Sequence, residues 1–223
     1  MDIKIYNHGA CIKGRMNDNE FHRHECLQVS MSKTDSTVAF KNRSISLPAN
    51  NALVIAYNIE HKLIESEWVN VLVDNECEVG RLLIELMGSN EYVVIADHEI
   101  IEKLFEDPER ELSRMNDVIR DEIKRAILLI KDHDHNCKLE GIAKEVGLSS
   151  DRFRKVFKEE VGITFKNYLR WQKLRRAFHL LTVSPETKLV DIAHQSGFSD
   201  QAHMTKIIRE TFGYNPKNIK NNL

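Results

Sequence analysis

Leu139–Gly162 reads LEGIAKEVGLSSDRFRKVFKEEVG, and Leu189–Gly213 reads LVDIAHQSGFSDQAHMTKIIRETFG. Both stretches contain an Ile-Ala pair, a glycine and a serine in the same order, followed by a helical segment that closes on a second glycine. The Ile-Ala pairs, 142–143 and 192–193, lie 50 positions apart, which indicates one structural unit used twice. Each copy has the pattern of a helix-turn-helix: a short helix, a tight turn at glycine, and a serine that caps a second helix.

The segment between the copies predicts a long connecting helix. From Thr164 to about Leu181 apolar residues recur at helical spacing, with a threonine cap at the start and Ser184-Pro185 near the end. A further helix is predicted upstream, from about Asn116 to Lys131. The polar segment DHDHN at 132–136 favours a solvated loop over a metal site, because alternating consecutive side chains rarely converge on one ion.

From Asp117 to Lys220 the chain resembles the AraC/XylS family of transcription regulators. The resemblance rests on both repeated motifs, on Leu174-Arg175-Arg176-Ala177 in the connecting helix and on the closing FGxxP pattern at Phe212–Pro216. Ile208 stands where the family usually has phenylalanine, an apolar replacement that alters packing rather than DNA readout. The resemblance implies recognition helices at residues 149–160 and 199–211, which enter successive major-groove segments about 34 Å apart on one face of the DNA.

The expected fold class is α+β. A small cupin-like β sensor domain is expected at residues 1–78, a helical linker that also serves as a dimerisation region at 79–115, and an all-α DNA-binding domain at 116–223. Strands are predicted at 27–31, 37–40, 52–57 and 68–73, helices at 79–89 and from 97 onward, and a strand or extended connection at 92–96. Ile100, Leu104, Leu112 and Met115 are expected to form a dimer seam or to pack onto the β domain.

DNA-contacting side chains are expected on both recognition helices. They are Ser150, Asp151, Arg152, Arg154, Lys155, Lys158, Gln201, Ala202, His203, Thr205, Lys206 and Arg209, of which Asp151, Arg154 and Lys155 match base-contacting positions of the family. Arg154 suits a bidentate contact to guanine, and Gln201 suits adenine. Asp151 accepts from a cytosine amino group or orients a neighbouring arginine, while Arg152 or Lys155 holds phosphate.

Several of these residues also have purely structural interpretations. The charges on the first recognition helix can form a solvated face, and His203 can cap or pack instead of touching phosphate. Phe153, Val156 and Phe157 are expected on the buried side of that helix. Trp171 and Phe178 favour the core over base stacking.

The histidines of the amino-terminal half are candidates for an effector pocket. His22 and His24 lie two residues apart, and side chains at that spacing share one side of an extended segment. With His61 they resemble the metal-binding pattern of cupins, but Glu25 does not have the cupin spacing. Structural or ligand-facing roles are therefore favoured over metal binding, and no cofactor is predicted.

Charge divides between the two halves. Residues 117–223 contain 20 Lys and Arg against 14 Asp and Glu, a net +6, whereas residues 1–116 contain 12 against 20, a net −8. A basic module beside an acidic one fits a phosphate-binding domain joined to a sensor. The four cysteines are scattered without a CxxC pair, which favours a reducing cytoplasm.

The sequence thus predicts a cytoplasmic, sequence-specific transcription regulator, an activator rather than an enzyme. No Walker, GxGxxG or Ser/His/Asp pattern is present. The expected partners are double-stranded DNA, RNA polymerase, a second copy in a homodimer and a small-molecule effector, with no membrane contact. Two alternatives stay open: a cupin-type metal-binding enzyme domain fused to a DNA-binding tail, and an adaptor whose helix-turn-helix units bind protein.

Overall fold

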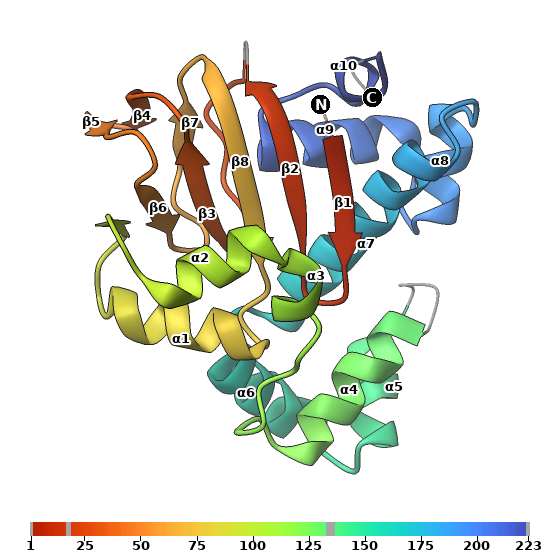
Figure 1. Cartoon of the computed structure of the whole chain (residues 1–223). Helices are drawn as coiled ribbons and strands as arrows, with labels where there is room; N and C mark the ends of the chain where they lie inside the picture. The colour runs from red at the N-terminus through yellow and green to blue at the C-terminus, as the bar shows by residue number, and fades with distance from the viewer. Residues whose placement is uncertain (1, 17–18, 133–136, 222–223) are drawn as a thin grey trace.

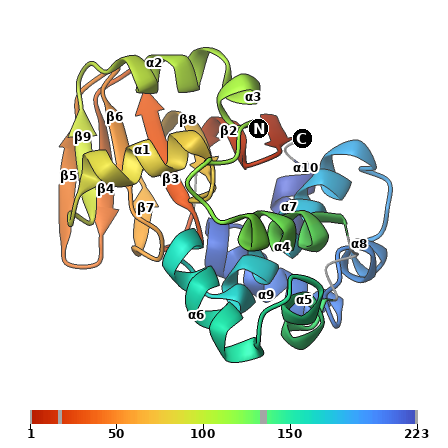
Figure 2. The same cartoon turned by 90° about the horizontal axis from the view of Figure 1, so that it is seen from below.

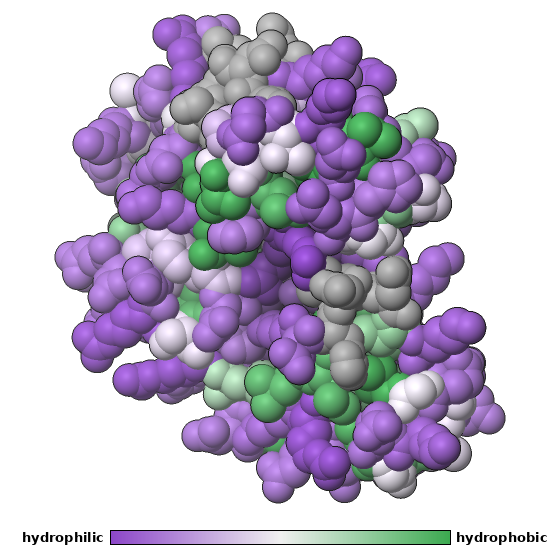
Figure 3. All heavy atoms as spheres, turned by 90° about the vertical axis from the view of Figure 1, so that its right-hand side faces the viewer, coloured by the Kyte–Doolittle hydropathy of each residue, from purple (hydrophilic) through white to green (hydrophobic). Residues whose placement is uncertain are grey.

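The computed structural model describes residues 2–16, 19–132 and 137–221, which form an amino-terminal β-sandwich and a carboxyl-terminal set of helices (Figure 1). The predicted α+β class is confirmed, with the β domain first and the helical domain second. No helix within the described residues has both the length and the apolar character needed to cross a membrane. The face that includes α8 is mostly hydrophilic, with a few apolar patches (Figure 3).

The larger sheet contains six antiparallel strands in the order β1-β2-β8-β3-β6-β9. Their bounds are Asp2–Tyr6 (β1), Gly9–Met16 (β2), Ser66–Val73 (β8), Leu27–Ser32 (β3), Ala52–Ile55 (β6) and Tyr92–Ile95 (β9). In the register, Val29 of the central strand β3 lies opposite Val54 on one side and Val71 on the other. Side chains alternate between the two faces of a strand, so this valine row occupies one face and its neighbours, such as Leu72, the other.

The smaller sheet has the order β5-β4-β7 and covers part of the inner face of the larger one. Its strands are Arg43–Leu47 (β5), Ser36–Phe40 (β4) and His61–Leu63 (β7). Val38 and Phe40 of β4 are buried in one cluster with Leu53 and Leu72 of the larger sheet. This face-to-face packing makes the domain a sandwich with one wide and one narrow sheet.

Three helices cover the outer face of the larger sheet: Glu78–Met87 (α1), Glu99–Glu106 (α2) and Pro108–Glu111 (α3) (Figure 1). Leu83 of α1 and Leu104 of α2 pack on the valine row, and Leu112 joins the same cluster. Because Leu104 and Leu112 are fully buried within the chain, they cannot form the dimer seam considered above. The alternative, packing onto the β domain, holds for these two residues.

The remaining helices form two helix-turn-helix units joined by one long helix. Their bounds are Asp121–Asp132 (α4), Leu139–Glu145 (α5), Ser150–Val161 (α6), Phe165–Val183 (α7), Leu189–Gln195 (α8), Gln201–Phe212 (α9) and Pro216–Asn221 (α10). The first unit lies below the sandwich and the second beside it in Figure 1, and Figure 2 gives the view from below. The first unit has a separate core, in which Phe153 and Phe157 pack on Phe165 and Tyr168 of α7.

The core of the second unit is continuous with the core of the sandwich. Leu174 and Phe178 of α7, and Ile208 and Phe212 of α9, belong to the same buried cluster as the inner face of the sheets. The small sheet is too narrow to cover β1 and β2, and the second unit fills the space that it leaves. The sandwich therefore encloses its core together with the second unit.

Most of the predicted elements are present, with three departures. The helix expected from Asn116 begins at Asp121, because Met115 forms a β-bridge with Cys77 and residues 117–119 turn, with the Asn116 side chain accepting from the Val118 N–H. Strands β1, β2, β5 and β7 were not predicted, since each is short, polar or interrupted by glycine. Strand β9, the undecided segment 92–96, extends the sheet into the region assigned to a linker. Residues 133–136 of the DHDHN segment lie outside the described residues.

Candidate DNA-binding surface

The first recognition helix, α6, is closed at both ends by local hydrogen bonds. The Ser149 side chain accepts from the Arg152 N–H at the amino end, and Gly162 ends the helix in the left-handed region at φ 81°. Phe153, Val156 and Phe157 are buried, as predicted. With the inner face fixed in this way, the opposite face turns outward.

All six residues predicted to contact DNA from this helix lie on its outward face. Ser150 is half-buried, and the other five are exposed: Asp151, Arg152, Arg154, Lys155 and Lys158. The Arg154 guanidinium donates to the Asp151 carboxylate over 2.7 Å, and Lys155 lies 3.9 Å from Glu159. The Asp151 carboxylate therefore holds the Arg154 side chain along the first turns of the helix, one of the two roles considered for it.

The second recognition helix, α9, begins one residue later than its sequence suggested. Asp200, not Ser199, is the N-cap: its side chain accepts from the backbone N–H of His203 over 2.7 Å. Aspartate and serine cap helices about equally well, so the repeat alone did not distinguish them. Ser199 instead contacts the Asp200 carboxylate and lies 3.0 Å from Nδ1 of His203.

The predicted contacts of α9 fall at two ends of the helix. Gln201, Ala202, His203, Thr205 and Lys206 occupy its first turns and are exposed or half-buried. The His203 ring meets the Phe198 ring edge to face, so this residue has the packing role proposed for it. Arg209 lies at the far end and is bound to the β domain.

A segment between β2 and β3 is hydrogen-bonded to the carboxyl end of α9. Glu20 accepts two hydrogen bonds from the Arg209 guanidinium, one of them 2.8 Å long. The Glu20 N–H donates to the Gly213 carbonyl (3.0 Å), and the Arg23 N–H donates to the Glu210 carbonyl (3.2 Å). We call residues 19–26 the clamp segment, because it holds a predicted phosphate contact against the sandwich.

The connecting helix α7 is fixed to the sandwich by the buried turn between β8 and α1. Asp74 accepts from the Trp171 indole over 2.6 Å and from the Arg175 guanidinium over 2.9 Å. Two residues further on, Glu76 accepts from the Tyr168 hydroxyl over 2.8 Å. Trp171 is buried, as predicted for a core residue. These bonds cross the boundary between the two halves of the chain.

Burial raises the pKa of the Asp74 carboxyl, and the nearby Glu76 carboxylate adds to that effect. Burial would also raise the pKa of Glu76, but a hydrogen bond from His8 and the charge of Lys131 lower it to about 2. Lys131 of α4 lies 3.9 Å from the Glu76 carboxylate and donates to the Asn7 carbonyl over 2.8 Å. The turn therefore ties the first unit as well as α7 to the sandwich.

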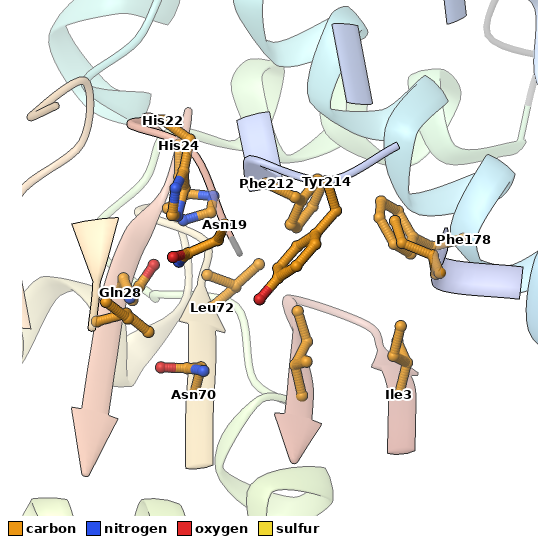
Figure 4. A pocket seen from close by; sticks show the side chains of 13 residues that line it. Ile3, Asn19, His22, His24, Gln28, Asn70, Leu72, Phe178, Phe212 and Tyr214 are labelled. Carbon is orange, nitrogen blue, oxygen red and sulfur yellow. The ribbon is translucent and has the colours of Figure 1, made fainter. Parts of the chain in front are cut away.

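The three histidines considered for an effector pocket meet at one place. His22, His24 and His61 are all buried, with ring centroids 4.6 to 5.4 Å apart. His22 and His24 line a cavity between the larger sheet and the second unit, to which Asn19, Phe212 and Tyr214 also contribute (Figure 4). The cavity volume is about 30 Å³.

Burial lowers the pKa of each of these histidines, to about 4 for His22, to about 3 for His61 and well below the usual value for His24. All three imidazoles are therefore neutral at neutral pH. The sequence indicated the trio but not its surroundings. Asn19, Asn70 and Phe212 join it only through tertiary contacts, and no pattern in the chain points to them.

The comparisons with known proteins agree with this geometry. Residues 142–222 match the helix-turn-helix domain family. The HTH-type transcriptional activator RhaS of Escherichia coli O139:H28 is 33% identical over 81 residues, which are 36% of this chain and 29% of RhaS. The chain thus spans less than a third of the length of this curated relative.

The similarity in fold extends over the whole chain. ToxT from Vibrio cholerae in its P21 form superposes with a TM-score of 0.61 at 13% identity, covering 97% of this chain and 99% of ToxT. ToxT bound to an unsaturated fatty acid gives a TM-score of 0.56 at 15% identity, covering 97% and 96%.

The chain therefore has the fold of proteins in which a β domain precedes two helix-turn-helix units. Within it, residues 142–222 form an AraC-type helix-turn-helix domain, which confirms the resemblance carried by the repeated motifs.

Replacing Asp74 should destabilise the protein strongly. Asp74→Ala leaves the buried Arg175 guanidinium without its carboxylate, and the loss of one partner of a buried pair costs about 3–5 kcal/mol of unfolding free energy. Urea unfolding followed by circular dichroism measures this cost. The matched control is Glu65→Ala at the exposed pair with Arg15, expected to cost less than about 1 kcal/mol. Equal losses in the two variants would contradict the importance of Asp74.

Releasing Arg209 should strengthen DNA binding. In Glu20→Gln the carboxylate that neutralises Arg209 is gone, and DNA affinity should rise by up to about fivefold at low salt. Glu65→Gln alters the exposed ion pair with Arg15 and does not touch Arg209, so it should leave DNA affinity unchanged. Fluorescence anisotropy with a labelled duplex measures both variants. Unchanged or weaker binding by Glu20→Gln would mean that Arg209 does not contact DNA.

Proposed function

We propose that this protein is a sequence-specific transcription regulator of double-stranded DNA, an activator that works in the cytoplasm. This proposal rests on the two helix-turn-helix units, each of which has a recognition helix with its charged and polar face turned outward. RhaS, a transcriptional activator, supports the regulatory role of the matched region. We assign no enzymatic reaction to the chain, since the matched relatives are regulators.

The first unit reads bases through Arg154. Its guanidinium offers two parallel donors to guanine O6 and N7, and Asp151 fixes the direction in which the side chain points. Arg152, Lys155 and Lys158 supply positive charge to the phosphates on either side. Ser150 contributes a hydroxyl at the amino end of the helix, where backbone N–H groups also favour phosphate.

The second unit reads a different pattern. Gln201 matches the donor and acceptor of adenine, and Ala202 or the Thr205 methyl group meets a thymine methyl. Lys206 supplies positive charge to the phosphate backbone of the DNA. Because Arg209 is held by Glu20, full contact of this unit with DNA phosphate requires the clamp segment to release the Arg209 side chain. The β domain thereby controls the second unit more directly than the first.

We also propose a role for each of the three regions of the chain. We assign DNA binding to residues 116–223, sensing to the sandwich within 1–78, and the connection to 79–115, whose β9 completes the larger sheet. A homodimer, RNA polymerase and a small-molecule effector are the further partners that we propose. ToxT has been solved with an unsaturated fatty acid, and an effector of similar size in this chain requires the cavity of about 30 Å³ to widen.

Selection of bound sequences from a random DNA pool, at two salt concentrations, tests the proposed function. Two short conserved blocks about 10 base pairs apart are expected, because two recognition helices on one DNA face read major-groove segments one helical turn apart. Recovery without any consensus would overturn sequence-specific recognition. A single block would contradict paired reading by the two units.

Arg154→Ala should weaken binding and relax the preference at one base position. Loss of one bidentate contact removes about 1–3 kcal/mol of discrimination between the right and the wrong base. Repeating the selection with this variant shows the change as a single degenerate position. Glu159→Ala, further along the same helix, is the control and should keep the full consensus. An unaltered consensus in Arg154→Ala would exclude direct readout by this arginine.

Lys158→Ala should lower affinity for all sequences alike. A phosphate contact carries no base information, so the selected consensus stays the same while the slope of log affinity against log salt flattens by about one unit. Titrations at four or more salt concentrations give the slope. A slope equal to that of the unaltered protein would remove Lys158 from the phosphate contacts.

A further inference from the structure

Three buried imidazoles of the β domain converge although no hydrogen bond joins them. His22 and His24 come from the clamp segment, and His61 begins β7. Backbone hydrogen bonds of 2.9 Å in both directions pair His22 with His61, which fixes the two rings side by side. One nitrogen from each of the three rings lies within 4.8 Å of the other two.

Two of the rings are held in the form that binds a metal ion. Nδ1 of His22 lies 2.8 Å from the Glu20 carbonyl, and Nδ1 of His61 lies 2.9 Å from the Ile59 carbonyl. A carbonyl only accepts, so Nδ1 carries the proton in each ring and Nε2 keeps a free lone pair. Histidines that ligate metals are oriented by this same outer contact to a backbone carbonyl.

The burial of the third ring, that of His24, is not balanced by hydrogen bonds from the protein. His24 is buried at 5% exposure, and neither of its nitrogens has a partner at hydrogen-bond geometry within the described residues, with the Gln28 side chain the polar group nearest to interacting with it. In addition, Nε2 of His61 lies 3.1 Å from the side-chain amide of Gln28, whose oxygen therefore also reaches the site. Unpaired buried acceptors are costly, and a cation among them would satisfy all of these lone pairs.

The surroundings favour an ion over an organic ligand. The adjoining cavity of about 30 Å³ has room for roughly two water molecules, far below the size of pockets that hold small organic compounds. A second cluster of possible ligands, His8, Asp74 and Glu76, makes a useful contrast. There Arg175 and Lys131 already supply the positive charge.

We propose that His22, His24 and His61 bind one divalent transition-metal ion, with Zn²⁺ as the preferred occupant and water or the Gln28 amide oxygen completing the coordination. Neutral imidazole is a ligand for zinc, and three histidines with one further oxygen donor fit its tetrahedral preference. This reverses the expectation from the sequence, which favoured structural or ligand-facing roles. The ring of Phe212, 5.4 Å from that of His24, closes the site on the side of α9.

Zinc titration of the chelator-treated full chain, without DNA, tests the site. One equivalent of Zn²⁺ should bind per chain, and a free concentration of 100 times the Kd should raise the Tm by about 5–10 °C. Co²⁺ in the same site should give the visible absorption of a tetrahedral complex, which is lost when excess Zn²⁺ is added. Because DNA is absent, a negative result leaves the proposed function untouched.

His24→Leu separates a metal ligand from a packing residue. Without metal this variant should melt at or above the Tm of the unaltered protein, since it removes two unpaired buried nitrogens. Its Zn²⁺ affinity should fall at least about 100-fold, because it loses a ligand rather than an outer contact. The control His179→Ala, an exposed histidine of α7, should bind Zn²⁺ as before.

Two results would overturn the proposal. One is the absence of stoichiometric Zn²⁺ binding and of a Tm shift in the unaltered chain, which requires no variant to fold. The other is Zn²⁺ binding that His24→Leu leaves unchanged, since the ion would then lie elsewhere on the protein.

Discussion

Six strands in one sheet face three in the other, and this mismatch determines how the two halves of the chain fit together. The inner side of β1 and β2 is apolar, with Ile3 and Ile12 buried, but no strand of the smaller sheet reaches it. Exposed apolar area is unfavourable in proportion to its size, so this surface has to be covered. The second helix-turn-helix unit covers it through Phe178 and Phe212, and one hydrophobic core therefore serves both a β domain and a DNA-binding unit.

The polar contacts at this boundary fix the orientation of α7 against the sandwich. An apolar face alone would tolerate sliding, whereas the buried Asp74 carboxylate accepts only in fixed directions from Trp171 and Arg175. The same turn orients Tyr168 through Glu76, so the helix that spaces the two recognition helices is set by the sandwich. The clamp segment then acts at the far end of the second unit. A change in the sandwich can thereby reach α9 along two separate paths, through α7 and through Glu20.

The sequence predicted the DNA-binding half well and the sandwich only in part. The repeated Ile-Ala and glycine positions specify helices whose ends depend on local caps, and such ends are readable from neighbouring residues. The exception, Asp200 in place of Ser199, differs by one residue because both side chains cap well. Strands β1, β2, β5 and β7 depend on partners far along the chain, and short polar strands carry little periodicity. The three histidines were identified as a group, but their burial beneath Phe212 could not be.

By itself, the sequence determined the local units: the two helix-turn-helix motifs, the helix between them, the outward charges of α6 and the first turns of α9, and the trio of histidines. It did so because caps, turns and helical periodicity act over a few residues. Only the tertiary structure decided that the second unit shares a core with the sandwich, that Arg209 lies against Glu20 and that His24 is buried without a partner. Those features join residues as far apart as 20 and 209, and such contacts depend on the shape and the uncovered area of the whole sheet.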